Sequence, residues 1–381
     1  ARGEYIFFLN NDTTVKENWL PPLIKLLESD RSIGMVGSKL IYPDGRLQEA
    51  GGIIWSDGSG WNYGRCDDPN KPEYNYVRDV DYISGAAIML GRKLWEEIGG
   101  FDERYAPAYC EDSDLAFEVR KRGLRVVYQP LSVVIHFEGV SNGTDVNGTG
   151  LKRYQVENNK KLQEKWSEEF KNQYDNVGVP NAFRARERSR GKKVILFVDH
   201  YVPTFDKDAG SKTTFQYIKM FIERGYVVKF LPDNFAKSEP YTEILEQMGV
   251  EVLYGNEMRT NIFEWIENNQ SNIDIVYLNR PHIATKYIDF IKEKRDFFEM
   301  SEEDFIDLYK RFYRLIYCIN DEQNKLTVGE NIKREINFYR NIANTKDKTR
   351  LLEKKNDVQD DPYLVLFSVF IVSSMDLYYT L

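Results

Sequence analysis

The chain has 381 residues and a formal net charge of −8. This length predicts two or more domains, each large enough to bury a core. An acidic chain without a basic stripe argues against nucleic acid as a partner. The cysteines, Cys66, Cys110 and Cys318, are scattered and lack CxxC spacing, which indicates neither a disulfide framework nor a zinc site. We therefore expect a cytoplasmic, multidomain protein.

The first predicted element is a buried strand over residues 5–9, the apolar run Tyr5-Ile6-Phe7-Phe8-Leu9. The polar sequence Asn10-Asn11-Asp12-Thr13 follows it directly. Ligand-binding groups of α/β proteins lie at strand ends. Amide and carboxylate oxygens are the hard ligands that Mg²⁺ or Mn²⁺ prefers. The pattern indicates a divalent-cation site at the end of this strand.

An amphipathic helix is predicted from residue 111 to residue 122, with Gly123 as its C-cap. Its first turn carries three carboxylates, those of Glu111, Asp112 and Asp114. The helix dipole and the free backbone N–H groups favour ionised carboxylates there. An ionised, positioned carboxylate is what a general base requires. The alternative is an N-cap cluster that has no chemical role.

A further strand is predicted over residues 132–135 and runs into His136-Phe137-Glu138-Gly139. The chain has only three histidines, and this one also follows a strand. A lone histidine is more often structural than a ligand. The accompanying motifs favour a functional role for His136.

These segments together resemble the family-2 glycosyltransferases, which are inverting enzymes of the GT-A fold, and most closely the rhamnosyltransferase-like members that build surface polysaccharides. The resemblance runs from residue 1 to about residue 170. The motifs that carry it are, in the family's order, Phe8-Leu9-Asn10-Asn11-Asp12-Thr13, Val36-Gly37-Ser38-Lys39-Leu40 with Tyr42-Pro43-Asp44-Gly45 and Ala50-Gly51-Gly52, Ser84-Gly85-Ala86-Ala87, Gly99-Gly100-Phe101-Asp102-Glu103, Glu111-Asp112-Ser113-Asp114-Leu115, and His136-Phe137-Glu138-Gly139-Val140-Ser141. Each motif alone is weak, but six in this order are specific.

The resemblance implies a metal site for Mn²⁺ or Mg²⁺. Asn10-Asn11-Asp12 occupies the family's DxD position, so Asp12 is the expected metal ligand beside the donor diphosphate. Asn10 replaces the first acidic residue, which makes its metal contact indirect, and with Asn11 it is expected to bind substrate. His136 matches a histidine that joins the metal in several relatives.

The resemblance also implies a base and a pocket. Asp112 matches the catalytic base that takes the proton of the acceptor hydroxyl. Glu111 is expected to orient this base or to bind the acceptor, and Asp114 is the third acidic candidate for substrate binding. Gly85 and Ala86 match small residues that line the pocket near the donor sugar.

The sequence begins with Ala1-Arg2-Gly3-Glu4, directly before the strand of the metal site. In the resembled family, a Rossmann-like half that holds the nucleotide base and ribose precedes this strand. We therefore expect a fragment of a longer chain that is incomplete for activity and binds UDP- or dTDP-sugars poorly.

A charged helix is predicted within residues 152–170 and closes the first domain, 1–170. Residues 171–191 are polar and contain Arg184, Arg186, Arg188 and Arg190. This composition predicts a solvated linker. The alternative is a segment that touches an anionic membrane surface, which would make the protein peripheral at the inner face of the cell membrane.

A second α/β domain is predicted over residues 192–292. Strand patterns at 193–198, 227–231, 250–253 and 273–278 alternate with helical patterns at 213–224, 240–248 and 261–269. This alternation predicts a parallel, Rossmann-like sheet. The segments Asp199-His200-Tyr201-Val202-Pro203, Ala209-Gly210-Ser211 and Asp274-Ile275-Val276-Tyr277 resemble the N-terminal half of family-4 GT-B glycosyltransferases.

The tail, residues 293–381, is charged and has apolar residues at helical spacing, which predicts a helical tail of unassigned role. Within it, residues 363–375 are apolar but too few to span a membrane. A core strand or helix is expected there.

The fold class expected from the whole chain is α/β: a partial GT-A domain with a Rossmann-like mixed sheet, a parallel-sheet domain and a helical tail. The function that the resemblance implies is metal-dependent, inverting transfer of a sugar from a nucleotide-diphosphate sugar to a saccharide or lipid-linked acceptor. Two alternatives stay open. One is a non-catalytic scaffold that binds sugar or acceptor, and the other is a nucleotidyltransferase.

Overall fold

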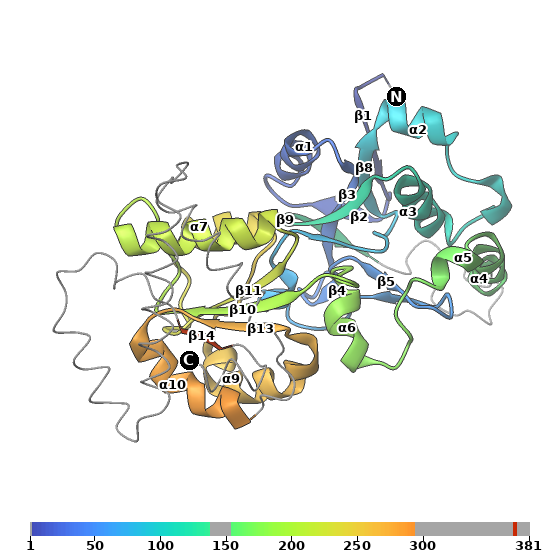
Figure 1. Cartoon of the computed structure of the whole chain (residues 1–381). Helices are drawn as coiled ribbons and strands as arrows, with labels where there is room; N and C mark the ends of the chain where they lie inside the picture. Colours follow the sequence, from blue (N-terminus) through green and yellow to red (C-terminus); the bar gives the residue numbers. More distant parts are fainter. Residues whose placement is uncertain (1, 138–153, 294–368, 372–381) are drawn as a thin grey trace, which may run out of the picture. The chain divides into compact units, whose positions relative to one another are not determined.

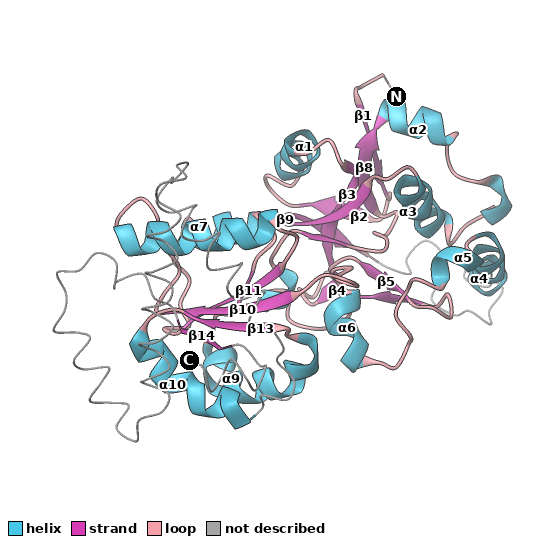
Figure 2. Cartoon of the chain, viewed as in Figure 1, coloured by secondary structure: helices cyan, strands magenta, loops and turns pink. Residues whose placement is uncertain are grey.

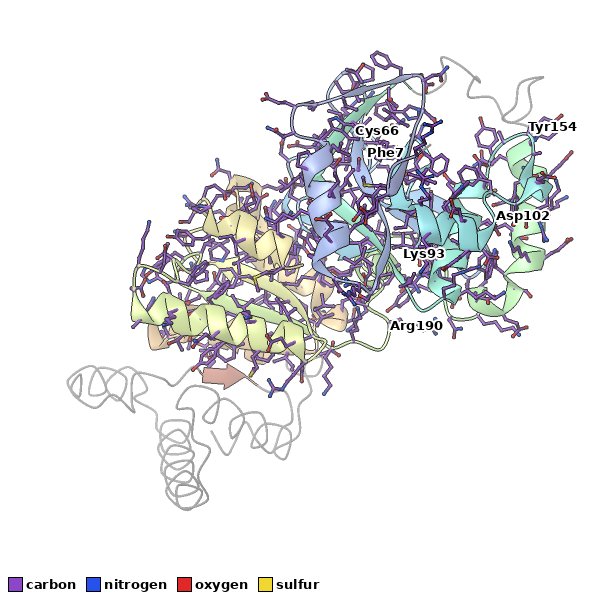
Figure 3. The ribbon with its side chains drawn as sticks, turned by 90° about the horizontal axis from the view of Figure 1, so that it is seen from above. Phe7, Cys66, Lys93, Asp102, Tyr154 and Arg190 are labelled. Carbon is purple, nitrogen blue, oxygen red and sulfur yellow. The ribbon has the colours of Figure 1, made fainter. Side chains whose placement is uncertain are left out.

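The computed structural model describes residues 2–137, 154–293 and 369–371. The chain divides into two compact units, of which the first comprises residues 1–190 with 246–249 and the second residues 191–245 with 250–381. Each unit is an α/β structure built on its own sheet (Figure 2). The expected α/β class with a mixed sheet and a later parallel sheet is confirmed.

The first unit contains the following elements in chain order (Figure 1): β1 (Tyr5–Leu9), β2 (Thr13–Val15), α1 (Leu20–Ser29), β3 (Ile33–Ile41), β4 (Leu47–Glu49), β5 (Gly52–Ile54), β6 (Gly60–Asn62), the 3₁₀ turn η1 (Pro72–Tyr74), β7 (Arg78–Asp79), β8 (Ala87–Gly91), α2 (Arg92–Ile98), the 3₁₀ turn η2 (Glu103–Tyr105), α3 (Glu111–Lys121), β9 (Arg125–His136), α4 (Tyr154–Lys165), α5 (Ser167–Phe170) and α6 (Val179–Ala185).

Its main sheet has seven strands in the order β1-β8-β3-β9-β2, with β4 paired to β3 and β7 to β9. The β3–β9 pair is parallel, and the other pairs are antiparallel. Every residue of β3 is buried, which agrees with its central position and its apolar sequence. The sheet is therefore mixed, with β3 at its centre.

Helices cover both faces of this sheet because successive side chains of a strand point to opposite faces. Met35 packs in a cluster with Leu115 of α3 and Leu162 of α4, whereas its neighbour Val36 packs in a cluster with Leu23 of α1. Figure 1 shows α1 on one side of the strands and α3 on the other. Two separate cores therefore hold the sheet.

The strand predicted at 132–135 is the end of the longer strand β9, which begins at Arg125. The helix predicted within 152–170 is divided into α4 and α5 at Trp166, whose φ of −115° is not helical. Trp166 is 2% exposed and stacks on Phe117 of α3. Packing of this indole interrupts the helix.

The structure differs from the solvated linker predicted at 171–191. This segment contains α6, and Arg186 is 3% exposed because it pairs with Glu73 at 2.9 Å and bonds the Tyr63 hydroxyl at 2.6 Å. Ala182, Phe183 and Ala185 are buried as well. The segment up to Arg190 is thus part of the first unit rather than a solvated connection.

The second unit contains β10 (Val194–Asp199), α7 (Ala209–Glu223), β11 (Val227–Pro232), α8 (Tyr241–Gln247, of which the last two residues are assigned to the first unit), β12 (Glu251–Val252), α9 (Asn256–Asn269), the 3₁₀ turn η4 (Gln270–Asn272), β13 (Ile275–Leu278), α10 (Pro281–Glu293) and β14 (Val369–Ile371). Its sheet order is β12-β11-β10-β13-β14. The first four of these strands are parallel to one another, as the alternating pattern predicts.

Side chains alternate across β10 as well. Phe197 packs with Tyr217 of α7 on one face, and Val198 packs with Ile262 of α9 and Tyr287 of α10 on the other. The two layers of helices are visible on opposite sides of this sheet in Figure 1. Because helices bury both faces of this parallel sheet, the sequences of its strands are continuous apolar runs.

The strand β14 is antiparallel to β13 and falls within the apolar segment 363–375. The remainder of the predicted helical tail, residues 294–368 and 372–381, lies outside the described residues. None of the helices in the described part of the chain is long and apolar enough to span a membrane.

Candidate active site

Two strand ends of the first unit bring Asp12 and His136 together. β2 is antiparallel to β9 with Thr13 opposite His136, and the Phe137 backbone N–H donates to the Asp12 carbonyl at 2.9 Å. The Nε2 atom of His136 lies 3.4 Å from Oδ1 of Asp12. Both side chains are only 12–13% exposed, so pairing of β2 with β9 holds a carboxylate and an imidazole side by side in a largely enclosed position.

Gln48 of β4 orients this histidine. Its side chain is 2% exposed, and its Oε1 lies 3.0 Å from Nδ1 of His136. An amide oxygen only accepts hydrogen bonds, so in this arrangement Nδ1 carries the proton. The lone pair of Nε2 then faces Asp12, which is the tautomer that a metal ligand requires. The sequence analysis missed Gln48, although it lies just before the motif Ala50-Gly51-Gly52.

The end of β1 and the loop before β8 lie against the start of α3. The backbone N–H of Asn10 donates to the Ala86 carbonyl at 3.1 Å, and the N–H of Gly85 donates to Oδ2 of Asp112 at 2.9 Å. Asn10 and Asn11 are exposed. The structure thus brings four predicted site residues, Asn10, Gly85, Ala86 and Asp112, into one hydrogen-bonded neighbourhood, and Asn11 follows Asn10 in the chain.

Gly85 is not required by crowding within the protein. A Cβ added there would lie 3.6 Å from Cβ of Asp112, which is ordinary van der Waals contact. The prediction that Gly85 leaves room for a donor sugar therefore concerns the ligand and stays a prediction.

The turn that precedes α3 has a strained backbone and is held in place by side-chain hydrogen bonds. Tyr109 and Cys110 have φ of 78° and 72°, a left-handed conformation that costs a non-glycine residue roughly 1 kcal/mol or more. The fully buried Asn158 of α4 holds this turn, because its Nδ2 donates to the carbonyls of Tyr105, Ala108 and Tyr109 at 2.7, 2.8 and 3.1 Å. A strained backbone that buried hydrogen bonds hold in place is typical of a functional turn.

Asp112 is held in one orientation at the start of α3. Besides the bond from Gly85, its Oδ1 accepts from the Ser113 backbone N–H at 2.7 Å. Burial raises the pKa of Asp112, while the bonds from Gly85 and Ser113 oppose that rise. The sequence analysis expected carboxylates here to stay ionised, but burial outweighs the helix dipole in this turn.

Burial and the neighbouring Asp112 carboxylate together raise the pKa of Glu111 to about 7. Its Oε2 is buried and has no hydrogen-bond partner among the residues that the structure describes. Two adjacent carboxylates that titrate as a pair retain a proton near neutral pH. The start of α3 therefore has an acid–base pair with a pKa in the physiological range.

A third carboxylate and a tyrosine lie near Asp112, and the sequence analysis missed both. Glu49 of β4 is fully buried and accepts from the Ser84 backbone N–H at 2.9 Å. Burial raises the pKa of Tyr82, and the charges of Glu49 and Asp112 raise it further. Tyr82 lies two residues before Ser84 of the Ser84-Gly85-Ala86 loop, and that proximity in sequence was the available signal.

The structure does not place Asp114 with this group. Its side chain is buried toward α4, where Oδ1 accepts from Tyr105 at 3.1 Å and from the Trp166 indole at 2.7 Å. Lys165 lies 2.9 Å from the same carboxylate. These bonds occupy Asp114 within the protein, and we assign it a structural role.

Asp12 and His136 alone would not make a complete metal site. Within the described ranges, no group of three or more His, Cys, Asp or Glu side chains is arranged to hold a metal ion. A carboxylate beside an imidazole lone pair nevertheless fits a divalent cation whose remaining ligands are water or substrate phosphate.

Residues 1–89 match the family model described as Glycosyl transferase family 2. The O-antigen biosynthesis protein RfbC of Myxococcus xanthus is 33% identical over 154 residues, which is 38% of this chain and 12% of that protein. The N-acetylglucosaminyl-diphospho-decaprenol L-rhamnosyltransferase of Mycobacterium tuberculosis is 40% identical over 68 residues, which is 18% of this chain and 22% of that protein. The chain thus spans less than a quarter of the length of these two relatives.

A Caenorhabditis elegans protein described as probable N-acetylgalactosaminyltransferase 9 is 24% identical over 195 residues, which is 46% of this chain and 32% of that protein. The crystal structure of GalNAc-T7 with UDP, GalNAc and Mn²⁺ aligns with a TM-score of 0.34 and 17% identity, covering 45% of this chain and 34% of that one.

The predicted family-2 resemblance of the N-terminal part is confirmed by the match over residues 1–89. The family-4 resemblance of residues 192–292 stays a prediction.

Proposed function

We propose that this chain acts as an inverting, metal-dependent glycosyltransferase that moves a sugar from a nucleotide-diphosphate sugar to a saccharide or lipid-linked acceptor of a surface polysaccharide. The observation that carries this proposal is the bond from Gly85 N–H to Asp112, beside the contact of Asn10 with Ala86. Through this loop, the base candidate and the strand that leads to Asp12 are parts of one rigid neighbourhood. The family-2 match over residues 1–89 covers the same segment.

Asp112 is the proposed base. One carboxylate oxygen takes the proton of the acceptor hydroxyl, and the hydroxyl oxygen forms a bond to the anomeric carbon. The bond from that carbon to the diphosphate oxygen breaks on the opposite side, so the configuration inverts. The bonds from Gly85 and Ser113 keep the carboxylate aimed during this step.

Glu111 has two effects on this step. Its negative charge raises the basicity of the neighbouring Asp112 when both are ionised. Its carboxylate, next to the proposed base, is also proposed to accept a hydrogen bond from a hydroxyl of the acceptor sugar. Glu111 is therefore the proposed residue that orients the acceptor.

Asp12 and His136 are the proposed ligands of a divalent cation, with Gln48 fixing the histidine tautomer. When bound, such a cation neutralises the charge that develops on the departing diphosphate. An imidazole suits first-row transition metals, and a carboxylate suits Mg²⁺ or Mn²⁺. The mixed pair favours Mn²⁺.

The test is a transfer assay on the protein at its natural length, with a panel of labelled UDP- and dTDP-sugars and lipid-linked saccharide acceptors. We expect product only with Mn²⁺ or Mg²⁺, no product with EDTA, and inverted anomeric configuration by NMR. Product with retained configuration, or undiminished product in EDTA, would contradict the proposal. Binding of donor and acceptor without any transfer would favour the scaffold alternative, and transfer of a nucleotidyl group the nucleotidyltransferase.

A further inference from the structure

A cavity in the first unit is lined by residues other than those of the candidate active site. It has a volume of about 240 Å³ and is lined by Asp81, Asn172, Gln173, Tyr174, Ala185, Arg188 and Arg190. None of these residues belongs to the acidic group at the start of α3 or to the Asp12–His136 pair. The cavity therefore needs an explanation of its own.

The charges around this cavity are mainly positive. Asp81 is 3% exposed, and its acceptors are already occupied: Arg188 and the Ile54 backbone N–H donate to its carboxylate, and Arg120 donates to its backbone carbonyl. Arg190 adds a further guanidinium, which lies over the Tyr174 ring at 5.5 Å and donates to the Gln173 carbonyl at 2.7 Å. The lining of the cavity thus contains two guanidinium groups, those of Arg188 and Arg190, and one carboxylate, that of Asp81.

The excess of positive charge is also seen in Arg120. Burial and the nearby charge of Arg188 lower the pKa of Arg120 to about 9. Its Nη2 is buried without a hydrogen-bond partner among the residues that the structure describes. An added negative charge would stabilise this group.

Gln173 is the second unsatisfied donor. Its side chain is 8% exposed and lines the cavity, and its Oε1 accepts from Arg188 at 3.5 Å. Its Nε2 is buried and finds no partner in the described part of the chain. Buried polar groups are nearly always hydrogen-bonded, so a lone buried amide N–H₂ beside a cavity indicates a missing acceptor.

We propose that this cavity binds a small oxyanion, a phosphate or carboxylate group, through Gln173, Arg188 and Arg190. The amide supplies donors for the anion, and the two guanidinium groups supply charge in a partly enclosed site. The volume is below that of a typical drug-sized pocket, which suits one anionic group or a small molecule that carries it. The proposal does not depend on the glycosyltransferase assignment.

Calorimetric titration of the full chain tests the proposal, with inorganic phosphate and sodium acetate as separate ligands and sodium chloride at equal ionic strength as the blank. We expect saturable binding of at least one oxyanion. Binding of phosphate alone would identify a phosphate site, and binding of both would identify a general oxyanion site. Absence of saturable binding of either anion up to about 10 mM would overturn the proposal.

The decisive variant is Gln173→Glu, which keeps an acceptor for Arg188 but replaces the amide donor with a negative charge. It should weaken anion binding by about tenfold or more, because a charge-assisted hydrogen bond is lost and a repulsion is gained. Its fold is checked by circular dichroism. Gln173→Leu, which removes the donor without adding charge, should weaken binding in the same direction and serves if the first variant does not fold.

Lys171→Gln is the matched control. Lys171 is 66% exposed, pairs with Glu168, and does not line the cavity, although it lies two residues from Gln173. It should leave the affinity unchanged. An equal loss of affinity in Lys171→Gln and Gln173→Leu would mean that general surface charge binds the anion, and it would also overturn the proposal.

Discussion

Gln48 orients the proposed metal ligand His136 through the ring nitrogen that faces away from Asp12. Its Oε1 lies 3.0 Å from Nδ1 of the histidine. Gln48→Leu removes this acceptor, so that neither the tautomer nor the ring orientation of His136 is fixed. We expect the Mn²⁺ concentration for half-maximal activity to rise about 10–100-fold, as for other residues that orient metal ligands.

A metal titration of transfer activity measures this effect. Gln163→Leu is the control, because Gln163 lies on α4, donates to the Asp57 carbonyl and is distant in sequence from Gln48 and His136. Unchanged metal dependence in Gln48→Leu would show that Gln48 does not position His136.

Glu111 makes stability depend on pH. Its folded-state pKa is raised to about 7 from the ordinary value near 4.5, so burial favours the protonated form. The stability that this shift contributes is fully present below about pH 4.5 and is lost as the pH rises through about 7. The free energy of unfolding of the wild type should therefore fall by on the order of 2 kcal/mol between pH 5 and pH 8. Glu111→Gln stays neutral throughout this range, so it should not show that fall.

Urea unfolding at several pH values measures this difference. Glu103→Gln is a suitable control, since that residue is exposed in η2 and is not one of the buried carboxylates. The same pH dependence in wild type and Glu111→Gln would mean that Glu111 titrates normally.

At the scale of elements, α3 is fixed to α4 by Asp114. This buried carboxylate bonds Tyr105 and Trp166 and pairs with Lys165. Asp114→Ala leaves two buried donors without an acceptor and one ammonium group with weaker partners. We expect a loss of about 3–5 kcal/mol in the free energy of unfolding, which chemical denaturation measures.

Asp44→Ala is the matched control, because Asp44 pairs with Arg46 on the surface and solvent screens that pair. Its unfolding midpoint should stay close to that of the wild type. A similarly small loss in Asp114→Ala would show that the α3–α4 contact does not depend on this carboxylate.

The first turn of α3 shows what a sequence pattern predicts and what it leaves open. The helix and its acidic start could be predicted from periodicity and capping residues. Asp112 and Asp114, however, differ by about 200° around the helix axis, so they face different partners. Only the packing of α4, with Lys165 and Trp166, determines that Asp114 points into the core and Asp112 toward Gly85.

At the scale of the whole molecule, the parallel strands of the second unit could be predicted because buried parallel strands are continuous apolar runs, whereas only β1 and the end of β9 were predicted in the first unit. The packing of the arginine-rich segment, residues 171–191, could not be predicted. Arg186 and Arg188 are paired with Glu73 and Asp81, which lie about a hundred residues earlier in the chain. Local composition carries no information on such distant partners, so the segment resembled a solvated linker.

The proposal for the whole molecule depends most directly on Asp112. The measurement is the rate of sugar transfer by the Asp112→Asn variant, in the protein at its natural length and with saturating Mn²⁺. The amide keeps the shape of the side chain but does not take a proton, so we expect the rate to fall by about 10²–10⁴ while nucleotide-sugar binding is retained. Turnover within about twofold of the wild type would contradict the assignment of Asp112 as the base.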